Sequence, residues 1–331
     1  MLSFILKRIA YALPTLALIS FFSFLVIELP PGDYMTTLQG TLVSQSGMSP
    51  GEARALTNQM REEYGLDQPF LVRYGEWISA IVTRGDFGFS FIFRRPVGEI
   101  IWQRLGMTLL VALCAHVISV VIGVLIGIYS ATHRNTFLDH IFTVLAFIGF
   151  SVPNFFLALL IMYVLAFGFG QHVGGFFSPD YVIAPWSWAR FVDFLKHFWI
   201  PVVVVGLAGT ARNMRVMRGN LLDVLNQNYV RTARAKGLSN RLVVFKHAVR
   251  NAVQPIVMYL GVALPFLLQG EIVTSAVLNL PTMGPVFLQS LVSQDMYLAG
   301  SFLMLLAVVL VIGNLLADIA LVWVDPRVSY D

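Results

Sequence analysis

Five long apolar segments limit what this chain can fold into. They cover Ile9–Ile27, Met107–Ser130, Ile141–Gly170, Ala252–Gly270 and Tyr297–Ala317, and none of them contains Asp, Glu, Lys or Arg. About 20 apolar residues, rising 1.5 Å each, cross a hydrocarbon layer about 30 Å thick. Backbone polar groups inside lipid must be satisfied within the segment, so each segment predicts a transmembrane helix.

A sixth apolar segment, Phe198–Ala211, is too short to cross a bilayer by itself. It becomes long enough if it extends through Arg212 to Met217, with the basic side chains reaching toward one interface. The sequence then predicts an all-α polytopic membrane protein with six transmembrane helices. Only 12% of the residues are charged and 57% are hydrophobic, and this charged fraction, about half that of a soluble domain, excludes a water-soluble fold.

The distribution of Lys and Arg predicts how these helices are oriented. Residues 212–250 carry nine Lys or Arg and a single acid, Asp223, so we expect this loop in the cytoplasm. Six spans then leave both termini cytoplasmic. The first span ends in Glu28-Leu29-Pro30-Pro31 without a small-residue cleavage site, which predicts a retained anchor instead of a signal peptide. The net charge of +4 is too small to indicate a nucleic-acid partner.

This topology divides the chain into three regions: 1–30 with the first transmembrane helix, an extracytoplasmic insertion at 31–105, and the remaining transmembrane part at 106–331.

The insertion is expected to be helical. Ser49-Pro50-Gly51-Glu52 has the pattern of a capping box and predicts a helix that ends at Gly65, with one face made of Ala53, Leu56, Met60 and Tyr64. A second helix before Gly85 would place Phe70, Tyr74, Trp77 and Ile81 together. Pro96 is predicted to begin a short helix that leads into the second span. Both a cap over the outer mouth and a simple connector between the first two spans fit this pattern.

Sequence motifs for catalysis and metal binding are absent from this chain. The six histidines are scattered, and no His-Glu-x-x-His, Cys-x-x-Cys or Gly-x-Ser-x-Gly spacing occurs. None of the four lysines follows a glycine, so the chain lacks the phosphate-binding loop of ATPases. We therefore expect no metal site and no cofactor of its own. Cys114 lies alone in an apolar run and is expected to be a core residue.

Ionisable residues within spans are functional candidates, because a charge in lipid is costly. Glu271 and Asp318 are the two carboxylates of this kind. Glu271 is expected near the outer end of its span, where both a pore-lining role and a satisfied structural role are open. Asp318 is expected to be structural, and His116 to be a hydrogen-bonding residue that faces the helix bundle. Neither carboxylate is expected at the midplane, which disfavours an ion-coupled carrier.

The basic loop has the pattern of two helices joined by a hinge. One helical face is predicted from the spacing of Leu222, Leu225, Tyr229 and Ala233. Gly237 would supply the hinge, and Ser239 would cap a second helix that runs to Pro255. Small residues interleaved with cations suit docking of a partner surface, and they equally suit a segment that lies on anionic lipid headgroups.

At this loop the sequence resembles a known family. Residues 229–238, Tyr-Val-Arg-Thr-Ala-Arg-Ala-Lys-Gly-Leu, followed by Lys246-His247-Ala248 and Pro255, are similar to the cytoplasmic EAA loop of binding-protein-dependent ABC importer permeases of the dipeptide/oligopeptide group. Further similar segments extend over nearly the whole chain, among them Pro31-Gly32-Asp33, Asn279-Leu280-Pro281 and Asp325-Pro326-Arg327.

The resemblance implies a permease in the bacterial cytoplasmic membrane with several partners. These are a second homologous permease subunit, two ATP-binding subunits that bind the ATP, and an extracytoplasmic substrate-binding protein. The residues that would dock on an ATPase are Arg231, Thr232, Ala233, Arg234, Ala235, Lys236 and Gly237. The expected substrate is a dipeptide or oligopeptide, with an oligosaccharide or another small solute as the alternative. A stand-alone channel, an ion-coupled carrier and a membrane-bound enzyme are less favoured.

The sequence departs from the family pattern where the substrate is concerned. Thr274-Ser275-Ala276 stands where Val-Glu-Thr is usual, and the acid occurs four residues earlier as Glu271. Glu271 and Ser275 are therefore the candidate residues of the translocation path.

Overall fold

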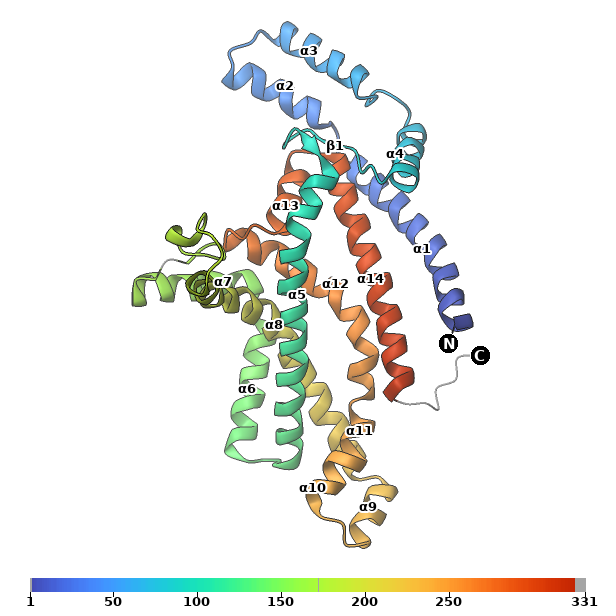
Figure 1. Cartoon of the computed structure of the whole chain (residues 1–331), viewed down its shortest axis with the longest axis vertical. Coiled ribbons are helices and arrows are strands. Elements are labelled where there is room, and N and C mark those ends of the chain that lie inside the picture. Colours follow the sequence, from blue (N-terminus) through green and yellow to red (C-terminus); the bar gives the residue numbers. More distant parts are fainter. Residues whose placement is uncertain (1, 172, 325–331) are drawn as a thin grey trace. The chain divides into compact units, whose positions relative to one another are not determined.

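The computed structural model describes residues 2–171 and 173–324, and most of them are helical (Figure 1). They form two compact units: one contains the chain up to Gly106 together with Thr282–Val308, and the other contains Met107–Pro281 and the chain from Val309 onward. The first unit holds α1 (Leu2–Glu28), α2 (Tyr34–Gln45), α3 (Pro50–Glu63), α4 (Phe70–Arg84), strands β1 (Phe89–Ser90) and β2 (Arg95–Pro96), and α13 (Met283–Val292). The second unit holds α6 (Phe137–Ser151), α7 (Asn154–Tyr163), η1 (Val164–Gly168), η2 (Pro179–Tyr181), α8 (Trp188–Leu225), α9 (Asn228–Ala235), α10 (Asn240–Leu242), η3 (Val243–Ala248), α11 (Val249–Ala252) and α12 (Gln254–Val277). Helices α5 (Val97–Thr132) and α14 (Met296–Val324) run through both units.

Long apolar helices confirm a polytopic membrane protein. Four described helices, α1, α5, α8 and α14, are long and apolar enough to cross a membrane, and α6 with the helix from Asn154 to Gly168 forms a fifth, bent candidate. The predicted sixth segment lies inside the 38-residue α8. The predicted span at Ala252–Gly270 lies almost entirely within α12.

Two of the helix predictions need correction. The run Ile141–Gly170 is not one straight helix, because the chain bends by 105° between α6 and α7. Pro153 stands at this break; its ring lacks an N–H and disfavours helical geometry in the residue before it. The helix expected from Pro96 starts one residue later, at Val97, and is not a separate short helix: Pro96 pairs with Phe89 in the β-ribbon, and α5 then continues unbroken for 36 residues.

Two local predictions for the insertion at 31–105, a capping box and a helix end, are confirmed. The capping box at α3 is present, with Glu52 N donating to Ser49 Oγ (3.3 Å) and Ser49 N donating to Glu52 Oε2 (3.2 Å). Gly85 ends α4 in the left-handed conformation, with φ of +66°. The predicted apolar face of α3 is partly wrong, since Ala53 and Thr57 are buried while Leu56 is 39% exposed.

Aromatic packing and ion pairs attach the insertion to the end of α1. Phe24 on α1 stacks on Trp77 of α4 with ring centroids 5.3 Å apart, and Arg73 pairs with Glu28. Arg61 of α3 donates through Nε and Nη2 to the two carboxylate oxygens of Asp33, each at 2.8 Å. Burial alone would raise the pKa of Asp33, but the bonds from Arg61 and Thr36 outweigh it and lower the pKa to about 2. The insertion is therefore a packed structure with fixed ionic contacts.

Asp295 joins the β-ribbon segment to the start of α14 within the first unit. Its Oδ2 accepts from Ser90 Oγ (2.6 Å) and Ile92 N (3.2 Å), and its Oδ1 accepts from Leu298 N (3.4 Å). The residue is fully buried.

Asp295→Ala is expected to destabilise this unit by about 1–3 kcal/mol, because it leaves buried donors without an acceptor. Faster proteolysis within residues 31–105 would report the loss, whereas Ser293→Ala, two residues away, should leave the rate unchanged. A wild-type rate in Asp295→Ala would contradict this role.

Glycines let α5 and α8 approach closely in the second unit. A Cβ added at Gly127 would lie 2.6 Å from Met217 Cβ and 2.8 Å from the Met214 carbonyl oxygen. From the other helix, a Cβ at Gly209 would lie 2.5 Å from Ser119 Oγ. Asn213 Nδ2 donates to that same hydroxyl at 3.1 Å. Small residues at a helix crossing of this kind are typical of membrane helix packing.

A second contact holds α6 against α8. Arg218 donates from Nε to Asp139 Oδ1 (3.0 Å) and from Nη2 to Oδ2 (2.9 Å), a two-bond pairing with a carboxylate that is 1% exposed. The position of α8 is thus fixed by a close crossing on one side and an ion pair on another.

The glycine crossing can be tested with one added methyl group. Gly127→Ala should lower the free energy of unfolding by about 1–3 kcal/mol, because the crowded Met217 and the α8 backbone must move. Gly106→Ala is the matched control on the same helix, since nothing lies within 4 Å of its added Cβ. Thermal unfolding of the purified protein in detergent measures both. Equal melting temperatures for the two variants would refute the close crossing.

Candidate functional site

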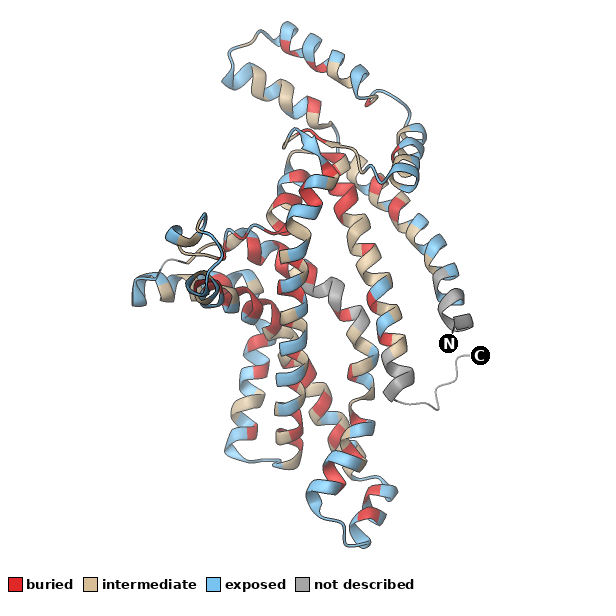
Figure 2. Ribbon diagram, in the orientation of Figure 1, coloured by how far each residue is buried: buried red, intermediate tan, exposed pale blue. Residues whose placement is uncertain are grey.

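The basic loop folds into a compact tip at one end of the second unit (Figure 1). Helix α9 buries Val230 and Ala233 against Val243, Val244 and Ala248 of η3 (Figure 2). The same apolar cluster continues to Met217 and Leu221 of α8. A buried face thus fixes α9 on a rigid base.

The predicted first helix of the loop is interrupted by a turn that the sequence pattern did not predict. The chain leaves the helix at Asn226 and Gln227, so Leu222 and Leu225 belong to α8 while Tyr229 and Ala233 belong to α9. The four residues do not share one helix, because the chain reverses between them. The Tyr229 hydroxyl instead accepts a hydrogen bond from Asn251 Nδ2 at 2.7 Å, which ties α9 to α11.

The second predicted helix is present and starts directly after Ser239, as expected. Gly237 has φ of +78°, a left-handed conformation that glycine adopts without strain, and it ends the first helix as expected. The helix from Asn240 to Ala252 then runs through α10, η3 and α11 and stops before Pro255. Ser239 precedes it but makes no side-chain capping bond, so that detail of the prediction is wrong.

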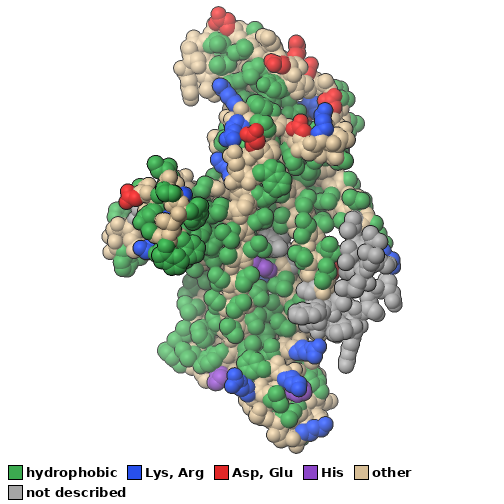
Figure 3. Space-filling view, viewed as in Figure 1, with side chains coloured by type: hydrophobic (Ala, Val, Ile, Leu, Met, Phe, Trp, Pro, Cys, Tyr) green, Lys and Arg blue, Asp and Glu red, His purple; other side chains and the backbone are tan. Residues whose placement is uncertain are grey.

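The outward face of α9 carries positive charge without compensation. Arg231, Thr232, Arg234, Ala235 and Lys236 are all exposed, and Gly237 follows them at the turn. Within residues 2–171 and 173–324, none of these three cations forms an ion pair. Figure 3 shows basic side chains gathered at this tip, below a body covered mostly by apolar side chains. The tip therefore presents an exposed cationic surface.

The two path candidates lie inside the chain. Glu271 and Ser275 on α12 are 1% and 0% exposed, and Ser275 Oγ donates to the Ile272 carbonyl oxygen at 3.1 Å. Neither residue lines the cavity of about 240 Å³ that lies between α5, α8 and α12, so their role in translocation stays a prediction.

That cavity contains polar residues that sequence reasoning did not assign to a path. Its lining includes His116 and Ser119 of α5, Asn154 of α7, and Arg212 and Asn213 of α8. The sequence signal for Arg212 was its position directly after the apolar segment Phe198–Ala211, but we expected its side chain at an interface. Asn154 gave no signal, because its place depends on the bend at Pro153.

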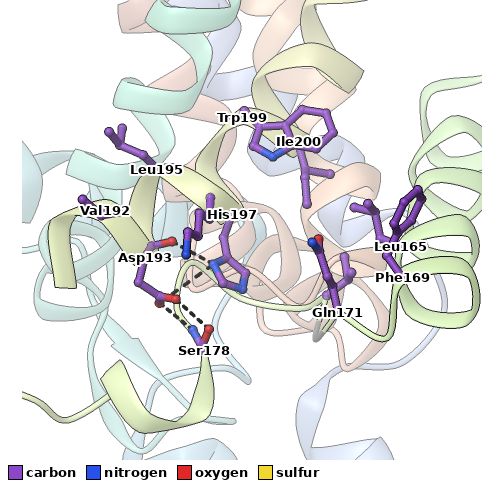
Figure 4. A pocket seen from close by; sticks show the side chains of 12 residues that line it. Leu165, Phe169, Gln171, Ser178, Val192, Asp193, Leu195, His197, Trp199 and Ile200 are labelled. Carbon is purple, nitrogen blue, oxygen red and sulfur yellow. Dashed lines mark hydrogen bonds and ion pairs between the residues drawn. The ribbon is translucent and has the colours of Figure 1, made fainter. Parts of the chain in front are cut away.

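A larger hollow of about 830 Å³ lies beside the start of α8 (Figure 4). Asp193 accepts there from Ser178 N (2.8 Å) and Ser178 Oγ (2.6 Å), while His197 Nδ1 donates to the Asp193 carbonyl oxygen (2.9 Å). A catalytic Ser-His-Asp arrangement requires the serine to bond to the histidine. Here the serine bonds to the aspartate, so the three residues hold the loop onto α8 and do not form a nucleophilic triad.

Comparisons with known proteins identify the family of this chain. Residues 123–330 match the family described as binding-protein-dependent transport system inner membrane component, and residues 1–112 match the amino-terminal family of the same transport systems. The chain belongs to this permease family. The resemblance seen at residues 229–255 is confirmed, and the chain is a transport component and not itself an enzyme.

Individual relatives cover the whole chain. The oligopeptide transport system permease protein of Bacillus subtilis is 34% identical over 331 residues, 100% of both chains. A putative peptide permease protein of Brucella suis is 35% identical over 333 residues, and a probable peptide ABC transporter permease protein of Sinorhizobium fredii is 31% identical over 328, each with 99% of both chains covered. Among the described residues of this permease, no cluster of His, Cys, Asp and Glu suits a metal ion. The motif Asp325-Pro326-Arg327 lies outside the described residues.

The anchoring of the permease tip is testable by proteolysis. Ala233→Leu should push α9 away from η3, because the new side chain exceeds the space at a site that is 7% exposed. Trypsin would then cut after Arg231, Arg234 or Lys236 several times faster in the purified protein. Ala235→Leu, on the exposed face of the same helix, is the control and should leave the rate unchanged. Identical cleavage of the two variants would contradict the buried face.

Proposed function

We propose that this permease forms half of the membrane channel of an ATP-driven importer in the bacterial cytoplasmic membrane. The second half is a homologous permease subunit, two ATP-binding subunits dock on the cytoplasmic side, and a binding protein delivers the substrate from outside. The six spans are α1, α5, the bent pair α6–α7, α8, α12 and α14, with both termini in the cytoplasm. The relatives named as peptide permeases support a dipeptide or oligopeptide as the substrate.

One observation supports the coupling role: one face of α9 is buried, and the other exposes cations that form no ion pair among the described residues. A helix with exposed cations and small residues between them can fit into an acidic groove of a protein. A helix that lies on lipid usually buries large apolar side chains beside its cations. Between Arg231 and Lys236 the exposed neutral residues are Thr232 and Ala235, which favours the protein partner.

The mechanism follows from how the tip is held. ATP binding closes the two ATPase subunits, and α9 moves with the groove in which it docks. Because Val230 and Ala233 pack on η3 and on the end of α8, the movement passes to α8 and, through α11, to α12. The spans then alternate between outward-open and inward-open arrangements. ATP is bound and hydrolysed by the partner subunits, and the permease needs no cofactor.

Charge reversal on the tip tests this function. Arg231→Glu with Arg234→Glu should reduce recovery of the ATPase subunits with the permease at least tenfold, because two attractive contacts become repulsive. Substrate-stimulated ATP hydrolysis of the reconstituted complex should fall in parallel. Arg54→Glu, an exposed residue of α3 in the insertion, makes the same kind of charge change and is the control. Full assembly and stimulated hydrolysis in the double variant would reject the docking role of α9.

A further inference from the structure

The cavity between α5, α8 and α12 contains three polar side chains that the coupling surface does not use. Arg212, His116 and Asn154 come from three different helices and line the same space of about 240 Å³. Within the part of the chain that the structure describes, none of the three makes a hydrogen bond or an ion pair. Their polar atoms are not sealed inside the protein, and all three side chains belong to the lining of the cavity.

Arg212 dominates the charge of this cavity. Its guanidinium carbon lies 3.2 Å from the centre of the Tyr259 ring, so the ring supports one face of the cation. The planar group still has its N–H donors available at its edge. Arg212 lies on α8, a helix that is long and apolar enough to cross a membrane, and an ionisable residue on such a helix is a candidate functional residue. Stacking on Tyr259 leaves those edge donors unmatched, so the cavity is suited to an anion.

The rest of the lining supports an anion as the ligand. No Asp or Glu is among the residues around the cavity. The wall beside Arg212 is fixed, because Asn213 is bonded to Ser119 at the close crossing of α5 and α8. Helix α7 begins at the cavity with Asn154 and has no side-chain cap, so its positive end adds to the field. Phe150, Ile256 and Leu260 make the remaining wall apolar, which strengthens electrostatic contacts inside.

We propose that this cavity binds the terminal carboxylate of the transported peptide during its passage. The proposal rests on the proposed function and names a contact of that substrate inside the permease. Arg212 pairs with the carboxylate through two parallel N–H bonds, and His116 and Asn154 donate to it from the facing helices. Binding pockets for whole small molecules usually measure about 300–1,000 Å³, so a space of about 240 Å³ suits one end of a peptide and not all of it.

The test compares a free carboxylate with its neutral amide. Radiolabelled tri-alanine and tri-alanine amide are bound at equilibrium to the complex of both permeases and both ATPases in lipid nanodiscs, without the binding protein. The wild-type complex should bind the free acid about tenfold more tightly than the amide. Arg212→Gln should remove this difference by weakening the acid alone. Arg212→Lys should retain part of the difference, because it keeps the charge and loses the planar fork.

Matched measurements distinguish a carboxylate contact at Arg212 from a general charge effect and from lipid binding. Arg215→Gln removes a neighbouring cation that stacks on Phe150 without lining the cavity, and it should leave the acid preference intact. If added phosphatidylglycerol in the nanodisc displaces the acid from the wild type but not from Arg212→Gln, the guanidinium binds lipid phosphate and the proposal is wrong. Equal affinity of the wild-type complex for acid and amide, or no binding of either, also overturns it. Assembly and ATP hydrolysis in the same preparations report the proposed function separately, so its failure would be visible as loss of the complex.

Discussion

The close crossing of α5 and α8 is the constraint on which the second unit depends. Lipid offers little hydrophobic gain for packing one apolar helix on another, so contact between backbones must supply the attraction. Gly123 and Gly127 on α5 and Gly206 and Gly209 on α8 make that contact possible. The bond from Asn213 to Ser119 matches donor to acceptor in a single register. A helix pair fixed in this way positions every other side chain of α8.

The other contacts of α8 extend this order to its neighbours. Arg218 holds α6 through Asp139, and α6 leads directly into the bend at Pro153 and the start of α7. At its far end α8 joins the apolar cluster that supports α9. The cavity is thus lined by α8, and the cationic tip is supported by the end of the same helix.

Much of this architecture was predictable because lipid imposes simple rules. A span must be apolar and helical over its whole length, so the apolar runs identified α1, α5, α12 and α14. Local signals were also reliable where one residue decides the geometry, as at the Ser49 capping box and at Gly237. The motif at 229–238 identified the family because its residue pattern is specific within a short segment.

The failures have equally physical causes. Composition shows that residues 141–170 are apolar, but it does not show the bend between α6 and α7, which occurs at Pro153. The position of Arg212 along its helix depends on the length of α8. This helix continues beyond its apolar centre through polar residues at both ends. The cavity itself is a product of five helices, and no single segment encodes it. Leu222 and Leu225 have helical spacing with Tyr229 in the sequence but not in space, because the chain turns at Asn226.

The unbroken lower half of α8 has a mechanical consequence. From Arg212 to Leu225 the helix spans 13 residue steps, about 20 Å, without a proline or a break. Such a segment transmits torque, so turning its end beside the joint at Asn226-Gln227 also turns the guanidinium over the Tyr259 ring. A rotation of one residue step, about 100°, would remove the cation from the cavity altogether. The joint at Asn226-Gln227 connects this helix to α9, so its stiffness would determine how much of the proposed movement of the tip reaches Arg212.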